Sequence, residues 1–174
     1  MLAIWYRPGD REGMKLQTQS VLLSALALAF TLPAVAQVEK VAMRTTGISC
    51  GICAGLSEIH FRQVPGVDKV TISLSKEAIM LTYKPGAVFD PEGIRKILQM
   101  WQVGVVQFQI SARGRVQEQG GKQFFLAGKD RFVLTAPTNV PDIRAGIPIR
   151  IEAILNDHVT PMEVKILNFQ PFTP

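Results

Sequence analysis

The chain has 174 residues, of which 47% are hydrophobic and 19% charged, so it can bury an ordinary core and wholesale disorder is excluded. A formal net charge of +5 is too small and too diffuse to indicate a nucleic-acid partner. Two cysteines cannot build a disulfide scaffold, and two histidines, His60 and His158, cannot build a three-histidine zinc site.

Residues 1–36 are typical of a secretory signal peptide. Lys15 precedes an apolar run over residues 21–32, and Pro33 and the small-residue pattern Ala34-Val35-Ala36 follow it. The run is shorter than the roughly 20 residues that a membrane-spanning helix needs. The alternative is an uncleaved signal segment that anchors the protein, which would be its one contact with a membrane. Translation could also start at Met14 instead of Met1. We therefore expect an exported protein, periplasmic or secreted, in an oxidising compartment.

Residues 38–111 are predicted to form an α+β domain with the order βαββαβ. Apolar and polar residues alternate, as in half-buried strands, over 41–44, 70–74, 79–83 and 106–110. One predicted helix follows the first strand and ends before Pro65-Gly66. The other begins at Asp90-Pro91, where an aspartate can cap the helix and a proline is tolerated. This order is that of a ferredoxin-like fold, with both helices on one face of an antiparallel sheet.

Each predicted helix has a face of apolar residues at helical spacing. In the first, the face contains Ile52, Leu56 and Ile59. In the second, it contains Ile94, Ile97, Leu98 and Trp101.

Residues 112–174 are predicted to form a second domain made of strands alone. Five short apolar runs are separated by glycines, over 113–118, 122–126, 131–134, 147–155 and 162–169. Five strands in so short a segment indicate a small barrel of the OB-like Greek-key type. A nucleic-acid role for it is not expected, because its charge is nearly balanced and Phe124, Phe125 and Phe132 are predicted to fill its core. The pair Asp157-His158 is predicted to lie in a solvated turn.

The two cysteines, Cys50 and Cys53, lie between the first predicted strand and the first helix. A helix start offers unpaired N–H groups and the positive end of the helix dipole, and both stabilise a thiolate. Two thiolates three positions apart can turn toward one point, and sulfur donors favour Cu(I), Hg(II) and Zn(II). Two ligands suit Cu(I) or Hg(II), whereas a closed zinc site requires further ligands.

Residues 41–110 resemble the heavy-metal-associated domain of copper chaperones, of the N-terminal modules of metal-pumping ATPases and of periplasmic mercury-scavenging proteins. The resemblance rests on Gly47-Ile48-Ser49-Cys50-x-x-Cys53, on Val64-Pro65-Gly66-Val67-x-x-Val70, on Ala78-Ile79-Met80-Leu81-x-Tyr83 and on the helix from Asp90. It implies that Cys50 and Cys53 are the metal ligands. The chain departs from the family at Ile48, where methionine is common, and at Met100-Trp101-Gln102-Val103-Gly104, where a glycine-aromatic pair is common.

Other candidate ligands are interpreted as structural. His60 is a conceivable third ligand, but a helix-surface or packing role is favoured. Met43 and Met80 could extend a copper site, but a core position is favoured for both. Trp101 is expected to anchor the second helix rather than to face a ligand.

The sequence thus predicts a metallochaperone or metal scavenger and not an enzyme. Its cargo would be a soft metal ion, Cu(I) ahead of Hg(II) or Zn(II), and its partner a metal-transporting membrane protein or another thiol metal carrier. Two alternatives stay open. Cys50-Gly51-Ile52-Cys53 has the spacing of a thiol-disulfide redox protein. The chain could also be an envelope interaction protein with a degenerate metal domain.

Overall fold

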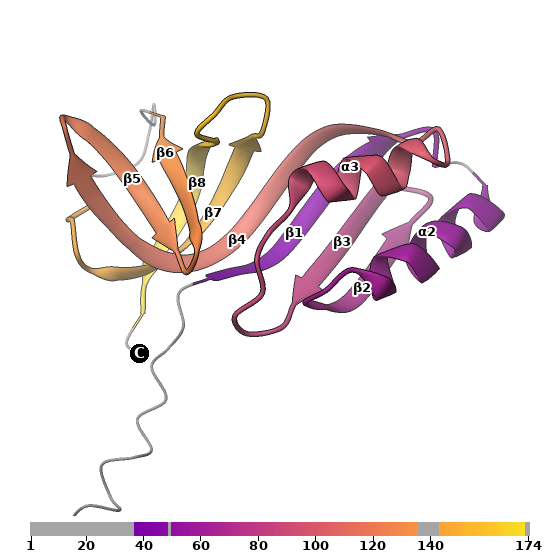
Figure 1. Ribbon diagram of the computed structural model, residues 1–174, viewed down its shortest axis with the longest axis horizontal. Helices are drawn as coiled ribbons and strands as arrows, with labels where there is room; N and C mark the ends of the chain where they lie inside the picture. Colours follow the sequence, from indigo (N-terminus) through magenta and orange to yellow (C-terminus); the bar gives the residue numbers. More distant parts are fainter. Residues whose placement is uncertain (1–36, 49, 136–142, 173–174) are drawn as a thin grey trace, which may run out of the picture. The chain divides into compact units, whose positions relative to one another are not determined.

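The computed structural model describes residues 37–48, 50–135 and 143–172, all within one compact unit, Ala34–Pro174. The predicted signal peptide, residues 1–36, lies outside the described residues. The described elements are mixed α and β, with two helices and eight strands (Figure 1). Neither of these two helices combines the length and apolarity that a membrane crossing requires.

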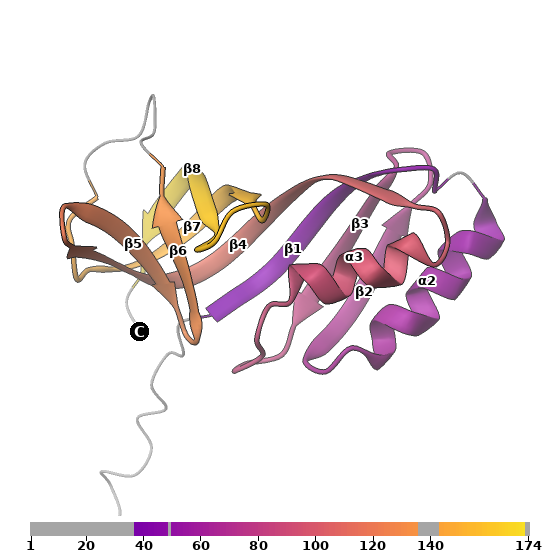
Figure 2. The same cartoon turned by 45° about the horizontal axis from the view of Figure 1, so that its top comes forward.

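The first six elements follow the predicted order. They are β1 (Gln37–Thr46), α2 (Gly51–Gln63), β2 (Val67–Ser73), β3 (Ala78–Tyr83), α3 (Pro91–Gln99) and β4 (Gly104–Gln119). The strands pair antiparallel in the order β2-β3-β1-β4. Both helices lie on one face of this sheet (Figures 1 and 2). Among the described residues, no helix covers the other face.

Helix α3 packs on the sheet through the predicted face. Asp90 caps it by accepting a hydrogen bond from the Gly93 N–H at 2.9 Å. Ile94 and Leu98 are buried, and Ile97 and Trp101 pack against them at the edge of the core. The alternation of apolar and polar residues at 3.6-residue spacing therefore identified this face correctly.

The predicted apolar face of α2 is wrong for Ile52 and Ile59, whereas Leu56 is half-buried. Ile52 and Ile59 are 77% and 54% exposed, whereas Ser57 and Phe61 are fully buried. The helix carries two apolar stripes, and burying the stripe with Phe61 removes a large aromatic ring from water. Ser57, on the same stripe, is small enough to allow a close approach to the sheet. The helix thus leaves isoleucines exposed on its outer side.

The last strands are β5 (Lys122–Ala127), β6 (Asp130–Leu134), β7 (Pro148–Asn156) and β8 (Glu163–Pro171). All five strands predicted after residue 112 are present, the first of them as the second half of β4. The pairing runs β4-β5-β6-β8-β7 and returns to β4, with β6 and β8 parallel and the other pairs antiparallel. The core predictions for Phe125 and Phe132 are confirmed, whereas Phe124 is half-buried beneath the Arg131 guanidinium, 3.8 Å away.

Strand β4 belongs both to the sheet that carries the two helices, β2-β3-β1-β4, and to the circuit of strands β4-β5-β6-β8-β7. Its residues 104–113 pair with β1, and its residues 115–119 pair with β5. Residues 108–115 pair with β7 on the opposite edge. The strand runs without a break through the predicted domain boundary between residues 111 and 112, and that boundary stays a prediction.

Replacing Gly114 by alanine is expected to destabilise the protein by about 1–3 kcal/mol or more. Gly114 is buried at the change of pairing partner, where an added Cβ would collide with the Leu126 carbonyl oxygen and lie 2.8 Å from Cζ of Phe125. The change can be measured as a shift of the urea unfolding midpoint. The control is Gly55→Ala in α2, which meets no atom within 4 Å and should stabilise the helix by about 0.5–1 kcal/mol. Equal stability of the two variants would contradict this prediction.

Candidate metal centre

Cys50 is the N-cap of helix α2. Its backbone is extended, with φ −112° and ψ 139°, and its Sγ accepts a hydrogen bond from the Cys53 N–H at 3.1 Å. Sulfur thus occupies the place that a serine or aspartate oxygen takes in most helix caps. No acidic residue lies in the first turn to offset the positive end of the helix dipole. The position therefore favours a negatively charged sulfur.

The two cysteine sulfurs are in direct contact. The structure joins Cys50 and Cys53 as a disulfide, with their Cα atoms 5.4 Å apart. Cys50 is exposed and Cys53 is half-buried, so the pair is open to solvent. The local geometry therefore brings both sulfurs to one accessible point, as the spacing predicts. Reduction of the bond would leave two thiols at that point, and a metal ion requires them in the thiolate form.

The loop before Cys50 packs against the core and against the α3–β4 connection. Ile48 is fully buried and so packs beneath the loop. Gly47 has φ +86°, and a Cβ there would lie 3.1 Å from the Gln102 carbonyl oxygen in the α3–β4 connection. Only glycine adopts this conformation freely. The loop that carries Cys50 is thus held against the sheet and against the end of α3.

The residues interpreted as structural are placed mostly as predicted. His60 Nδ1 lies 2.8 Å from the Leu56 carbonyl oxygen, and its ring packs edge-on against Trp101 with centroids 5.5 Å apart. Met43 is buried in the core, but the core prediction for Met80 is wrong, because Met80 is 41% exposed on the helix-free side of β3. In the described part of the chain, no group of three His, Cys, Asp or Glu residues could hold a metal ion.

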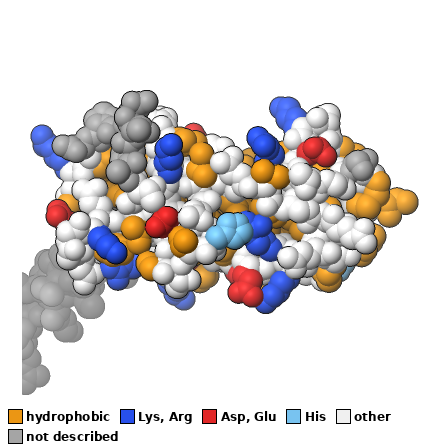
Figure 3. Space-filling model, turned by 90° about the horizontal axis from the view of Figure 1, so that it is seen from above, with side chains coloured by type: hydrophobic (Ala, Val, Ile, Leu, Met, Phe, Trp, Pro, Cys, Tyr) orange, Lys and Arg blue, Asp and Glu red, His pale blue; other side chains and the backbone are white. Residues whose placement is uncertain are grey.

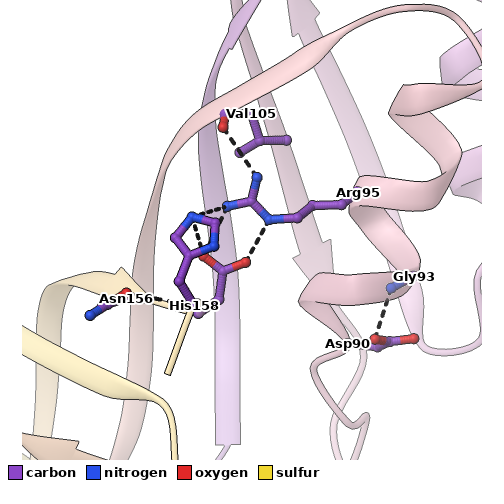
Figure 4. A network of polar contacts seen from close by, with 7 residues as sticks. Asp90, Gly93, Arg95, Val105, Asn156 and His158 are labelled. Carbon is purple, nitrogen blue, oxygen red and sulfur yellow. Dashed lines mark hydrogen bonds and ion pairs between the residues drawn. The ribbon is translucent and has the colours of Figure 1, made fainter. Parts of the chain in front are cut away.

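The prediction of a solvated turn at Asp157-His158 is wrong for Asp157. Its carboxylate, with a side chain only 6% exposed, accepts from Nε and Nη2 of Arg95 at 2.6 and 2.9 Å (Figure 4). Arg95 also donates to the Val105 carbonyl oxygen at 3.2 Å and lies over the Phe108 ring. The aspartate thus ties the β7–β8 loop to α3. His158 alone is exposed, as the prediction requires.

Six chains of known structure match part of this chain. No protein-family model and no curated protein sequence matches the chain. Among solved structures, the chain is similar to the yeast copper transporter domain Ccc2a, solved in its apo and Cu(I)-loaded states, with 21% identity and a TM-score of 0.35 over 39% of this chain and 94% of that one. It is also similar to a copper-binding domain of HMA7, a P-type ATPase, with 21% identity and a TM-score of 0.34 over 39% and 93%. Similarity at this level carries no information on function.

Proposed function

We propose that the protein is an exported, non-enzymatic carrier of a soft metal ion, which it binds through the reduced thiolates of Cys50 and Cys53. The observation that supports this most is the contact of the two sulfurs at an exposed helix start, where Sγ of Cys50 already accepts an N–H hydrogen bond. Two soft donors at an open site suit Cu(I) first, and Hg(II) or Zn(II) next. The partner would be a metal-transporting membrane protein or another thiol carrier in the periplasm or outside the cell.

A competition titration tests this proposal. The protein is reduced and titrated with Cu(I) in the presence of a chromophoric Cu(I) chelator, and the titration is repeated after both thiols are alkylated. We expect one ion bound per chain in the reduced protein and none in the alkylated protein. Equal binding in the two samples would show that the cysteines are not the ligands.

Metal affinity should decrease as the pH falls. Both thiols must lose their protons to become ligands, so binding releases up to two protons per ion. The apparent affinity for Cu(I) should therefore fall by up to about 100-fold per pH unit where both thiols are protonated before binding. The measurement is the competition titration at several pH values, with the affinity of the competing chelator corrected for its own protonation. An affinity independent of pH would argue against thiolate ligands.

A thiol-disulfide redox protein is the second candidate, and the disulfide between Cys50 and Cys53 favours it. The two functions differ in turnover. A redox protein should reduce insulin disulfides repeatedly when supplied with a dithiol, and its pair should have a reduction potential in the range of disulfide exchange proteins. A metal carrier should show little turnover and should bind Cu(I) once reduced. The two assays on one preparation separate the candidates.

The pairing circuit β4-β5-β6-β8-β7 supports the proposal that residues 112–174 form an OB-like barrel. We propose no nucleic-acid role for this barrel. On the face in Figure 3, basic and acidic side chains are interspersed and do not gather in a basic patch.

A further inference from the structure

The helix-free face of the sheet contains a polar cavity. Strands β1 and β7 pair on opposite edges of β4, so β2-β3-β1-β4-β7-β8 form one continuous antiparallel sheet. Residues directly opposite each other in such a sheet point to the same face. The cavity, of about 430 Å³, lies over β3, β1, β4, β7 and β8. Its size is in the range of small-molecule sites.

A β-bulge in β1 directs a carboxylate into this cavity. The pairing of β1 with β4 is regular up to Val38 and resumes at Lys40, which leaves Glu39 as an extra residue. Val38 and Val41 are both buried in the core. Glu39 and Lys40, between them, therefore both lie on the helix-free side, and both line the cavity. Bulges are a common means of redirecting a side chain toward a site.

Two arginines from neighbouring strands converge on Glu39. Nε of Arg113 lies 2.6 Å from Oε1, and Nε of Arg150 donates to Oε2 at 3.1 Å. Arg113 and Arg150 are direct neighbours across β4 and β7. The side chains are only partly exposed, at 18% for Glu39, 28% for Arg113 and 48% for Arg150. The Glu39 carboxylate thus lies between two guanidinium groups, in an ion pair with Arg113 and a hydrogen bond from Arg150.

The arrangement leaves cationic donors available for a ligand. Both arginines approach Glu39 through Nε, and among the described residues their four Nη atoms have no hydrogen-bond partner. Lys40 adds a third positive charge, and Glu152, opposite Ser111, adds a second negative one, so the cavity keeps a net positive charge. Paired guanidinium groups match the oxygen pairs of carboxylates and phosphates. The ion pairs with the Glu39 carboxylate show that the guanidinium groups of Arg113 and Arg150 already bind one oxyanion, which belongs to the chain itself.

We propose that this cavity is a binding site for a soluble oxyanion, a phosphate or carboxylate group, which Arg113 and Arg150 hold beside Glu39. The site is on the opposite face from the helices and uses no residue of the cysteine pair. The inference goes beyond metal carriage and does not depend on it.

Titration with inorganic phosphate and with acetate, at constant ionic strength, tests the proposal. Binding is followed by the Nε–Hε signals of the arginines in ¹H–¹⁵N spectra of the whole protein. We expect saturable shifts of the Arg113 and Arg150 signals with at least one anion. Arg150→Gln should weaken binding about fivefold or more, and Glu39→Gln should strengthen it about fivefold, which is the effect of one unit charge at about 4 Å in water.

The control is Lys129→Gln in the exposed β5–β6 turn, which removes the same charge as Arg150→Gln but lies outside the cavity. It should leave the anion affinity unchanged, and unshifted amide signals elsewhere show that each variant is folded. Three results would overturn the proposal: no saturable shift with either anion, equal weakening in Arg150→Gln and Lys129→Gln, or binding to vesicles containing phosphatidylglycerol without binding to either soluble anion.

Discussion

Replacing Cys50 by serine is expected to abolish tight Cu(I) binding and to leave the fold intact. The variant loses one of two metal ligands, so affinity should fall by more than the roughly 10–100-fold that loss of a supporting contact around a metal site costs. Serine is itself a preferred helix cap, and its hydroxyl can accept the Cys53 N–H in place of sulfur. The measurement is a Cu(I) competition titration of the reduced variant, together with its unfolding midpoint in urea.

The matched control is His60→Gln. His60 lies on α2, about 15 Å along the helix axis from Cys50, and packs against Trp101. The His60→Gln variant should bind Cu(I) as tightly as the unchanged protein. If His60→Gln weakens binding as much as Cys50→Ser, the two-sulfur site is wrong and a mixed sulfur-nitrogen site replaces it.

Replacing Asp157 by alanine is expected to destabilise the protein by about 1–3 kcal/mol. Arg95 would keep its charge, with a side chain only 21% exposed, and would lose a bidentate partner. Removal of one partner of a largely buried hydrogen-bonded group costs about 1–3 kcal/mol, because the group that remains is left unpaired. The comparison is Glu58→Gln, which breaks the exposed pair with Arg62 on α2 and should cost about 0.5 kcal/mol or less. Similar losses in both variants would show that the Asp157 pair has no special structural role.

The same pair should make stability sensitive to acid. Burial disfavours the charged form of Asp157, but the hydrogen bonds and charge of Arg95 outweigh burial and hold the pKa of Asp157 below its usual value. A carboxylate with a lowered pKa contributes stability above its unfolded-state pKa and loses it as the pH falls through the folded-state value. The difference in unfolding free energy between the unchanged protein and Asp157→Ala should therefore shrink as the pH falls below about 4. Urea unfolding at several acidic pH values measures this, and a constant difference would contradict it.

Sequence patterns predicted the strands and the α3 face because each depends on local periodicity. Ile94, Ile97 and Leu98 recur at helical spacing, and the charged Arg95 and Lys96 lie between them, so one face was apolar and the other was not. The proximity of the Cys50 and Cys53 sulfurs could be predicted for the same reason, because a strand-to-helix turn and a three-residue spacing together determine where two sulfurs lie. Their role as metal ligands stays a prediction.

Features that depend on distant partners could not be predicted in this way. Helix α2 has two apolar stripes, and only the sheet beneath it selects the stripe with Phe61 over the one with Ile52. Asp157 pairs with a residue 62 positions away, and nothing in the local sequence distinguishes it from a solvated turn residue. Glu39 enters the polar cavity through a one-residue bulge, which shifts the side-chain alternation that sequence patterns assume.

X-ray absorption at the copper edge of the reduced, Cu(I)-loaded protein tests the two-sulfur site most directly, because it identifies the atoms bound to the metal. The contact of the sulfurs of Cys50 and Cys53 at an exposed helix start predicts one copper ion per chain with two sulfur donors from the protein. A spectrum with only nitrogen and oxygen donors, or a reduced protein that takes up no Cu(I), would contradict the proposed function.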